Sequence, residues 1–140
     1  MPSEAAETFT LQDAQAVLAA QPFAQVVGGE LTAFRDGRAE LRIAPDERHR
    51  QQDGVVHGGV LSYAADNVLT FAAGAAVGPA VWTAGYTIDY LSRALGDELI
   101  ARAETMRAGS RLITVRAELF DRRDDTEHLC AIAQGTVARR

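Results

Sequence analysis

The sequence lacks the residues and spacings on which several common chemistries depend. It has one cysteine, Cys130, so no disulfide can form within the chain, and its apolar neighbours predict a buried, inert thiol. The three histidines do not stand at metal-ligand spacings, and we expect no metal site. No Gly-x-Ser-x-Gly motif surrounds Ser62 or Thr70, so neither of them resembles the nucleophile of a serine hydrolase.

An excess of positive charge and a secretory leader are also missing. The 140 residues carry a net charge of −5 at pH 7 with no long run of one sign, which argues against nucleic acid or an anionic membrane as the main partner. Glu4 and Glu7 stand where a leader would carry basic residues, so we expect no export signal and a cytoplasmic protein. The length suits a single domain over residues 1–140.

The segment that follows His57 is apolar nearly all round, and it predicts one long buried helix at about 58–77. Ser62, Asp66 and Thr70 stand four residues apart and mark a single polar stripe along this helix. Asp66, at its centre, also makes the segment a poor transmembrane candidate. Burying its charge is unfavourable unless the group is paired or solvated, so Asp66 is either functional or satisfied by nearby donors.

The remaining pattern predicts one short helix and six strands. Alternating apolar residues indicate a hairpin within 31–43, followed by strands at about 81–91, 97–107, 111–121 and 127–138. A first helix is expected at about 10–20, with Thr10 as its N-cap. This order favours an α+β fold in which an antiparallel sheet of about six strands wraps around the long central helix.

Several residues off the stripe receive structural predictions. Strict alternation within 81–91 places Trp82 and Tyr90 on one face of the strand, and we expect both rings to pack in the core. His49 and His128 lie in polar segments and are expected at the surface.

A motif with a defined spacing connects the glycines around the start of the long helix with Asp66. It comprises Gly54, the sequence His57-Gly58-Gly59, and Asp66-Asn67, nine residues after the histidine. Segments 86–92 and 133–136 add further likeness. Over residues 25–138 the chain resembles the hotdog-fold acyl-CoA thioesterases, in particular the subgroup of the phenylacetate-pathway thioesterase and thioesterase superfamily member 2. The resemblance implies a hotdog fold and hydrolysis of an acyl-CoA thioester.

The resemblance also implies roles for individual residues. Asp66 would act as general base or nucleophile, and the Gly58 N–H would polarise the thioester carbonyl. The His57 side chain would help to hold the loop and the thioester. Gln51 stands where the family often has an asparagine that holds substrate or water, and Thr83 stands where some members orient the attacking water. The family assembles this site between two subunits, so the resemblance predicts at least a homodimer, and a homotetramer built as a dimer of dimers.

Contacts to the substrate are predicted for a second set of residues. CoA is part of the substrate, so no separate cofactor is expected. Gly59 allows close approach at the helix N-terminus, and Asn67 neighbours the carboxylate. The arginines stand at strand ends near turns, where they could pair with the CoA phosphates or remain solvated; they are Arg93, Arg107 and Arg111.

Other functions remain open at this level. His57 could serve only as a hinge residue bonded to backbone. The same fold hosts dehydratases and hydratases of acyl thioesters, although this chain lacks the motifs that surround their catalytic histidine. A non-catalytic acyl-CoA-binding or regulatory domain is the alternative from another class.

Overall fold

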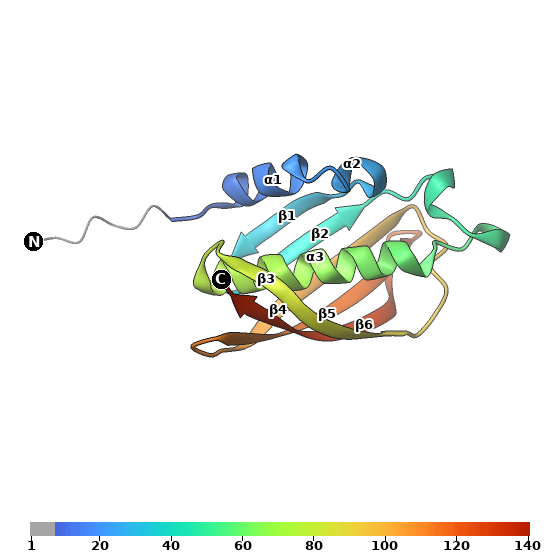
Figure 1. The fold of residues 1–140 in the computed structure, drawn as a ribbon. Helices are drawn as coiled ribbons and strands as arrows, with labels where there is room; N and C mark the ends of the chain where they lie inside the picture. The colour runs from blue at the N-terminus through green and yellow to red at the C-terminus, as the bar shows by residue number, and fades with distance from the viewer. Residues whose placement is uncertain (1–7) are drawn as a thin grey trace, which may run out of the picture.

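A computed structural model describes residues 8–140 (Figure 1). The helices are α1 (Leu11–Ala20), α2 (Ala24–Val27) and α3 (Gly58–Val77), with single 3-10 turns at Glu47–His49 and Gln52–Gly54. The strands are β1 (Glu30–Arg35), β2 (Arg38–Ile43), β3 (Val81–Tyr90), β4 (Glu98–Ala108), β5 (Leu112–Arg123) and β6 (Thr126–Arg139). The predicted α+β architecture is confirmed, and the short α2 was not predicted.

The strands form one antiparallel sheet in the order β1-β2-β4-β5-β6-β3. The sheet curls around α3, while α1 and α2 lie beside β1 on the same side (Figure 1). This is the hotdog arrangement. Strands β1 and β3 are the two edges, so β3 carries a row of backbone groups that β6 does not satisfy.

Helix α3 begins and ends where the sequence predicts. His57 is its N-cap, and Gly78 ends it with a φ of 99°, a backbone conformation that favours glycine. Among residues 8–140, α3 is the one helix long and apolar enough to cross a membrane, and it is the core helix of this domain. Its polar stripe faces away from the centre of the sheet and towards β3.

A bulge in β3 overturns the expected strict alternation. Thr83 pairs with Val137 and Gly85 with Thr136, so Ala84 is the extra residue. The inward face therefore changes from odd to even positions at the bulge, and Thr83 and Tyr86 both point to α3. The prediction that Trp82 and Tyr90 belong to the core is wrong, because 61% and 53% of their surfaces are exposed.

The prediction that His49 lies at the surface is also wrong, since only 7% of it is exposed. Its Nδ1 accepts a hydrogen bond from the Asp46 N–H at 2.9 Å, and its Nε2 lies 2.6 Å from the Val27 carbonyl oxygen. The ring thus ties the loop before α3 to the end of α2, a long-range contact that its polar neighbours do not reveal. His128 is exposed, as predicted. Cys130 is buried, which raises the pKa of its thiol to about 12.

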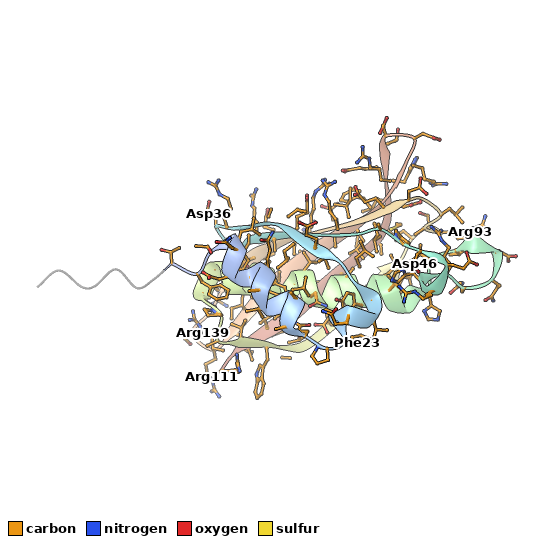
Figure 2. All side chains as sticks on the ribbon, turned by 90° about the horizontal axis from the view of Figure 1, so that it is seen from above. Phe23, Asp36, Asp46, Arg93, Arg111 and Arg139 are labelled. Atoms are coloured by element: carbon orange, nitrogen blue, oxygen red, sulfur yellow. The ribbon has the colours of Figure 1, made fainter. Side chains whose placement is uncertain are left out.

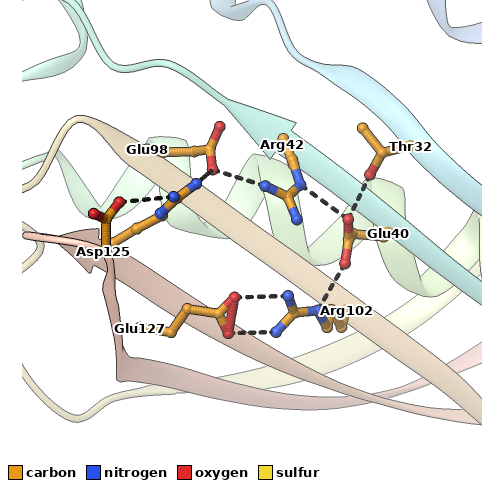
Figure 3. Close-up of polar contacts among 8 residues, drawn as sticks. Thr32, Glu40, Arg42, Glu98, Arg102, Asp125 and Glu127 are labelled. Atoms are coloured by element: carbon orange, nitrogen blue, oxygen red, sulfur yellow. Dashed lines mark hydrogen bonds and ion pairs between the residues drawn. The ribbon is translucent and has the colours of Figure 1, made fainter.

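The outer face of the sheet carries a connected set of ion pairs (Figure 3). Glu40 accepts hydrogen bonds from Thr32, Arg102 and Arg42 at 2.7, 2.7 and 2.9 Å. Burial raises the pKa of Glu40, but these donors outweigh it and lower the pKa to about 2. Arg102 also donates two hydrogen bonds of 2.7 Å to the Glu127 carboxylate. The charges on this face therefore neutralise one another, away from the polar stripe of α3.

A buried carboxylate fixes the turn between β3 and β4. Asp121 is 2% exposed and accepts hydrogen bonds from the Leu95 N–H at 3.0 Å and the Gly96 N–H at 2.8 Å, with Arg123 Nε at 3.0 Å. Asp121→Ala leaves these donors without an acceptor, so we expect the free energy of unfolding to fall by about 3 kcal/mol. Urea denaturation measures it.

The control for this variant is Asp125→Ala. Asp125 pairs with Arg122 at 3.0 Å on the same hairpin, but its side chain is 93% exposed. An exposed pair contributes little, so the denaturation midpoint should stay near that of the native chain. Equal midpoints for the two variants would show that the Asp121 contacts do not stabilise the fold.

Candidate active site

A cavity of about 720 Å³ opens along the polar stripe of α3. It is bounded by α3, by β3 and by residues from the α1–α2 region, and most of the aromatic side chains of the chain line it: Phe9, Phe23, Phe34, Tyr63, Phe71, Trp82 and Tyr86. Asp66 lies in this lining, and Arg140 is the one other charged side chain there. The cavity is thus lined mainly by aromatic rings, with the polar stripe of α3 and its Asp66 carboxylate in one wall.

Hydroxyl groups hold the Asp66 carboxylate. The Thr83 hydroxyl donates to Asp66 Oδ1 at 2.5 Å, and Thr70 Oγ1 lies 2.6 Å from Thr83 Oγ1. One turn before Asp66, the Ser62 hydroxyl forms a hydrogen bond with Tyr86 Oη. None of the hydrogen bonds among residues 8–140 uses Asp66 Oδ2. Asp66 therefore has one anchored oxygen and one that a reactant can use.

The N-terminus of α3 presents a free amide. His57 Nδ1 accepts a hydrogen bond from the Gly59 N–H at 2.7 Å, and the His57 carbonyl accepts from the amides of Val60 and Leu61. Within the described chain, the Gly58 N–H is the one amide of this first turn without an acceptor. The His57 side chain is thus hydrogen-bonded to backbone, as in the predicted hinge role, and it does so as the N-cap of the helix. The free Gly58 amide, at the positive end of the helix dipole, can bind a partial negative charge.

Tyr90 contacts Gly58 from the end of β3. Its hydroxyl donates to the Gly58 carbonyl at 3.1 Å, and a Cβ at position 58 would lie 3.3 Å from its Cζ. A Cβ at position 59 would lie 2.9 Å from His57 Nδ1, so a side chain there would disturb the cap. A side chain is therefore excluded more strictly at position 59 than at position 58, where a small shift of the Tyr90 ring would make room for a Cβ.

A second hollow of about 590 Å³ lies at this helix end, and Gln51, His57, Gly58 and Arg93 line it. Gln51 faces the same hollow as the Gly58 amide, but no hydrogen bond of its side chain occurs among residues 8–140. Asp66 is absent from this lining. Asp66 follows Gly58 by eight positions along the helix, a rise of about 12 Å.

The predicted substrate contacts are divided among three places. Gly59 borders both hollows, and Asn67 lines the Asp66 cavity while its amide donates to the Tyr63 carbonyl at 3.0 Å. Arg93 lies at the end of the molecule opposite to Arg111, as Figure 2 shows. Arg107 pairs with Thr114 on the hairpin that leads from β4 past Arg111 into β5.

The three arginines predicted to bind CoA, which are Arg93, Arg107 and Arg111, lack carboxylate partners in the described chain. Arg139 lies beside Arg111, where its N–H donates to the Arg111 carbonyl at 3.0 Å (Figure 2). The guanidinium groups of Arg93, Arg107 and Arg111 can therefore pair with an anionic ligand, whereas Arg139 Nε already donates to the Gly109 carbonyl at 3.2 Å.

Sequence reasoning missed two of these contacts. The sequence alone assigns Tyr86 and Tyr90 to a strand without these contacts. The hydrogen bond between Tyr86 and Ser62 depends on the bulge, and the one from Tyr90 to Gly58 depends on where β3 ends. One signal was present, because a glycine inside a strand, here Gly85, often marks a bulge. No group of three or more potential metal-ligating side chains occurs in the described part of the chain.

Comparisons with known proteins identify the family and the fold. The family profile of the thioesterase superfamily matches residues 53–128, a span that runs from before α3 into β6. The chain therefore belongs to the thioesterase superfamily, which confirms the resemblance seen in the motif. A search of curated protein sequences gives no match.

Solved structures extend the likeness to nearly the whole domain. A thioesterase family protein from Silicibacter pomeroyi is 27% identical, with a TM-score of 0.85 over 91% of this chain and 95% of that one. A mutant of the phenylacetic acid degradation protein PaaI from Thermus thermophilus is 27% identical, with a TM-score of 0.73 over 86% and 100%. Zebrafish thioesterase superfamily member 2 is 21% identical, with a TM-score of 0.81 over 94% and 99%, and shares the fold.

Proposed function

We propose that the protein hydrolyses an acyl-CoA thioester to a free acid and CoA, with Asp66 as general base or nucleophile. The observation that carries the proposal is the placement of Asp66. Thr83 anchors its Oδ1, its Oδ2 has no partner in the described chain, and a cavity of about 720 Å³, lined mainly by aromatic rings, offers room for an acyl group. Membership of the thioesterase superfamily supports the same reaction.

Thioester hydrolysis requires a nucleophile on one face of the carbonyl and a donor for the oxygen that becomes negative. As a base, Asp66 would take a proton from water as the hydroxide adds to the carbonyl carbon. As a nucleophile, it would form an anhydride that water then opens. In both routes the Gly58 N–H would stabilise the oxyanion, and the CoA thiolate would leave and take up the proton. Both routes consume one water and release the free acid and CoA.

We propose further that each site is shared by two copies of the chain. Asp66 and Gly58 of one chain open into different hollows and lie about 12 Å apart along α3, too far for one carbonyl to touch both. The edge strand β3 has free backbone groups over its length, and antiparallel pairing with a second β3 would bring the helix end of one copy towards the cavity of the other. A dimer of dimers would then give the predicted tetramer.

The same pairing would place Arg93 of one copy at the hairpin end of the other, near Arg107 and Arg111. We propose that these guanidinium groups bind the CoA phosphates. The single thiol of the chain is buried, which suits the proposed reducing, cytoplasmic setting.

Arg111→Ala is expected to raise KM for an acyl-CoA about fivefold to tenfold, because a charge-assisted contact to phosphate is lost, and to leave kcat nearly unchanged. The matched substrate is the N-acetylcysteamine thioester of the same acid, which lacks the nucleotide. Its KM should not respond to the variant. An equal rise in KM for both thioesters would place Arg111 outside the phosphate site.

Steady-state hydrolysis of phenylacetyl-, hydroxybenzoyl-, hexanoyl- and palmitoyl-CoA, followed by release of free thiol, tests the activity itself. Turnover of at least one ester supports the proposal and identifies the acyl class. Binding of these esters without turnover would favour the acyl-CoA-binding alternative. Hydration or dehydration of an enoyl or hydroxyacyl ester, in place of thiol release, would favour the hydratase alternative.

A further inference from the structure

Thr70 occupies a position in the site that the proposed reaction does not use. It follows Asp66 by one helical turn and lines the same cavity. Its Oγ1 lies 2.9 Å from the Asp66 carbonyl oxygen and 2.6 Å from Thr83 Oγ1. The first contact is the common back-bond of a threonine within a helix. The second contact reaches another element, β3, and the hydroxyl that anchors Asp66.

The number of protons decides the direction of these bonds. Each threonine hydroxyl has one proton to donate. An ionised carboxylate can only accept hydrogen bonds. The Thr83 hydroxyl must therefore donate its one proton to Asp66 Oδ1, at 2.5 Å. The 2.6 Å contact between the two hydroxyls is then a hydrogen bond only if Thr70 is its donor. With Asp66 ionised, the bonds then run from Thr70 to Thr83 and from Thr83 to Asp66, and the one Thr70 proton serves the shorter contact, to Thr83, in place of the longer back-bond to the Asp66 carbonyl.

This order gives Thr70 a definite effect. A hydroxyl that accepts a hydrogen bond becomes a better donor, because bonds in a chain polarise one another. Thr70 also occupies a lone pair of Thr83 and so limits the rotation of its hydroxyl. Without Thr70, the Thr83 hydroxyl could turn towards water in the cavity and release Asp66 Oδ1.

We propose that Thr70 is a positioning residue, which acts through Thr83 to hold the Asp66 carboxylate with Oδ2 directed to the reactant. The inference rests on the proposed hydrolysis. It goes beyond that proposal because Thr70 need touch neither water nor thioester. Ser62 occupies the corresponding place one turn before Asp66, but it bonds to Tyr86 and to no group of the carboxylate.

The test compares Thr70→Val and Thr70→Ser with the native enzyme on its best acyl-CoA. Valine keeps the branched shape without the hydroxyl, and kcat is expected to fall about threefold to tenfold while KM stays within about twofold. Serine restores the hydroxyl and should recover most of kcat. Thr105→Val is the control, since Thr105 also donates to a carbonyl of α3, at Ala72 and 3.1 Å, outside the cavity. It should leave kcat unchanged.

A double-mutant cycle with Thr83→Val isolates the route of the effect. If Thr70 acts through Thr83, Thr70→Val will have no further effect on kcat in the Thr83→Val background. The inference is overturned if the two losses multiply, if serine fails to restore kcat, or if KM alone changes. A native enzyme without thioesterase turnover would overturn the proposed function together with this inference, so the two failures are distinguishable.

Discussion

Asp66→Asn is expected to lower kcat for acyl-CoA hydrolysis by about 100-fold or more. The amide has nearly the same shape, and its oxygen can still accept the hydrogen bond from Thr83. It can neither take a proton from water nor attack a carbonyl effectively. The loss should therefore appear in kcat, with KM within about threefold of the native value. Thiol release under saturating substrate measures it.

The matched control is Asn67→Ala, measured for folding and for substrate binding in parallel. Asn67 lines the same cavity, but its amide is directed to the Tyr63 carbonyl of its own helix. We expect a much smaller loss of kcat than for Asp66→Asn. Undiminished turnover in a folded Asp66→Asn protein would mean that another group activates the nucleophile.

Gly58→Pro is expected to lower kcat by about 100-fold or more, because it removes the one amide assigned to the oxyanion. Proline is well tolerated at the first position of a helix, where its fixed φ fits and no intrahelical bond is lost. His57 has φ −61° and ψ 137°, an extended conformation that suits a residue before proline. The substitution is therefore a removal of one N–H with little other change in the backbone.

Gly58→Ala is the comparison that isolates the amide. Its Cβ meets the Tyr90 ring at 3.3 Å, as does that of proline, but its N–H is retained. We expect most of kcat to survive in the alanine variant. If alanine and proline reduce kcat equally, the contact with Tyr90 rather than the amide determines the rate.

Local pattern was enough to predict the framework of this protein. The bounds of α3 follow from an apolar run that lies between His57 and Gly78 in the sequence. The spacing of Ser62, Asp66 and Thr70 likewise predicted the polar stripe, and all three line the cavity. Hydrophobic periodicity and caps act over a few residues, so they can be read without the fold.

Long-range contacts were not predictable in this way. The bulge at Ala84 depends on how β3 pairs with β6, and it decides that Thr83 and Tyr86 meet α3 while Trp82 remains largely exposed. The burial of His49 depends on a carbonyl twenty-two residues earlier in the chain, at Val27. Such contacts join segments whose patterns are independent of one another, and only the folded chain brings them together.

The geometry of a single chain also explains why a second copy is central to the account. The proposed base, Asp66, and the proposed oxyanion amide, of Gly58, belong to one helix, yet they line different hollows. A twofold arrangement would unite the base of each chain with the amide of its partner, and would form two equivalent sites. A dimer of one chain that lacks the Asp66 carboxylate and one chain that lacks the Gly58 amide should then recover part of the native activity.

The most direct test uses hybrid dimers of Asp66→Asn and Gly58→Pro chains, coexpressed with different affinity tags and purified through both. A shared site predicts that each hybrid contains one site with a native Asp66 and a native Gly58, and so recovers about half of the native kcat per dimer. A hybrid no more active than its two parents would contradict the account, because both groups would then have to act within one chain.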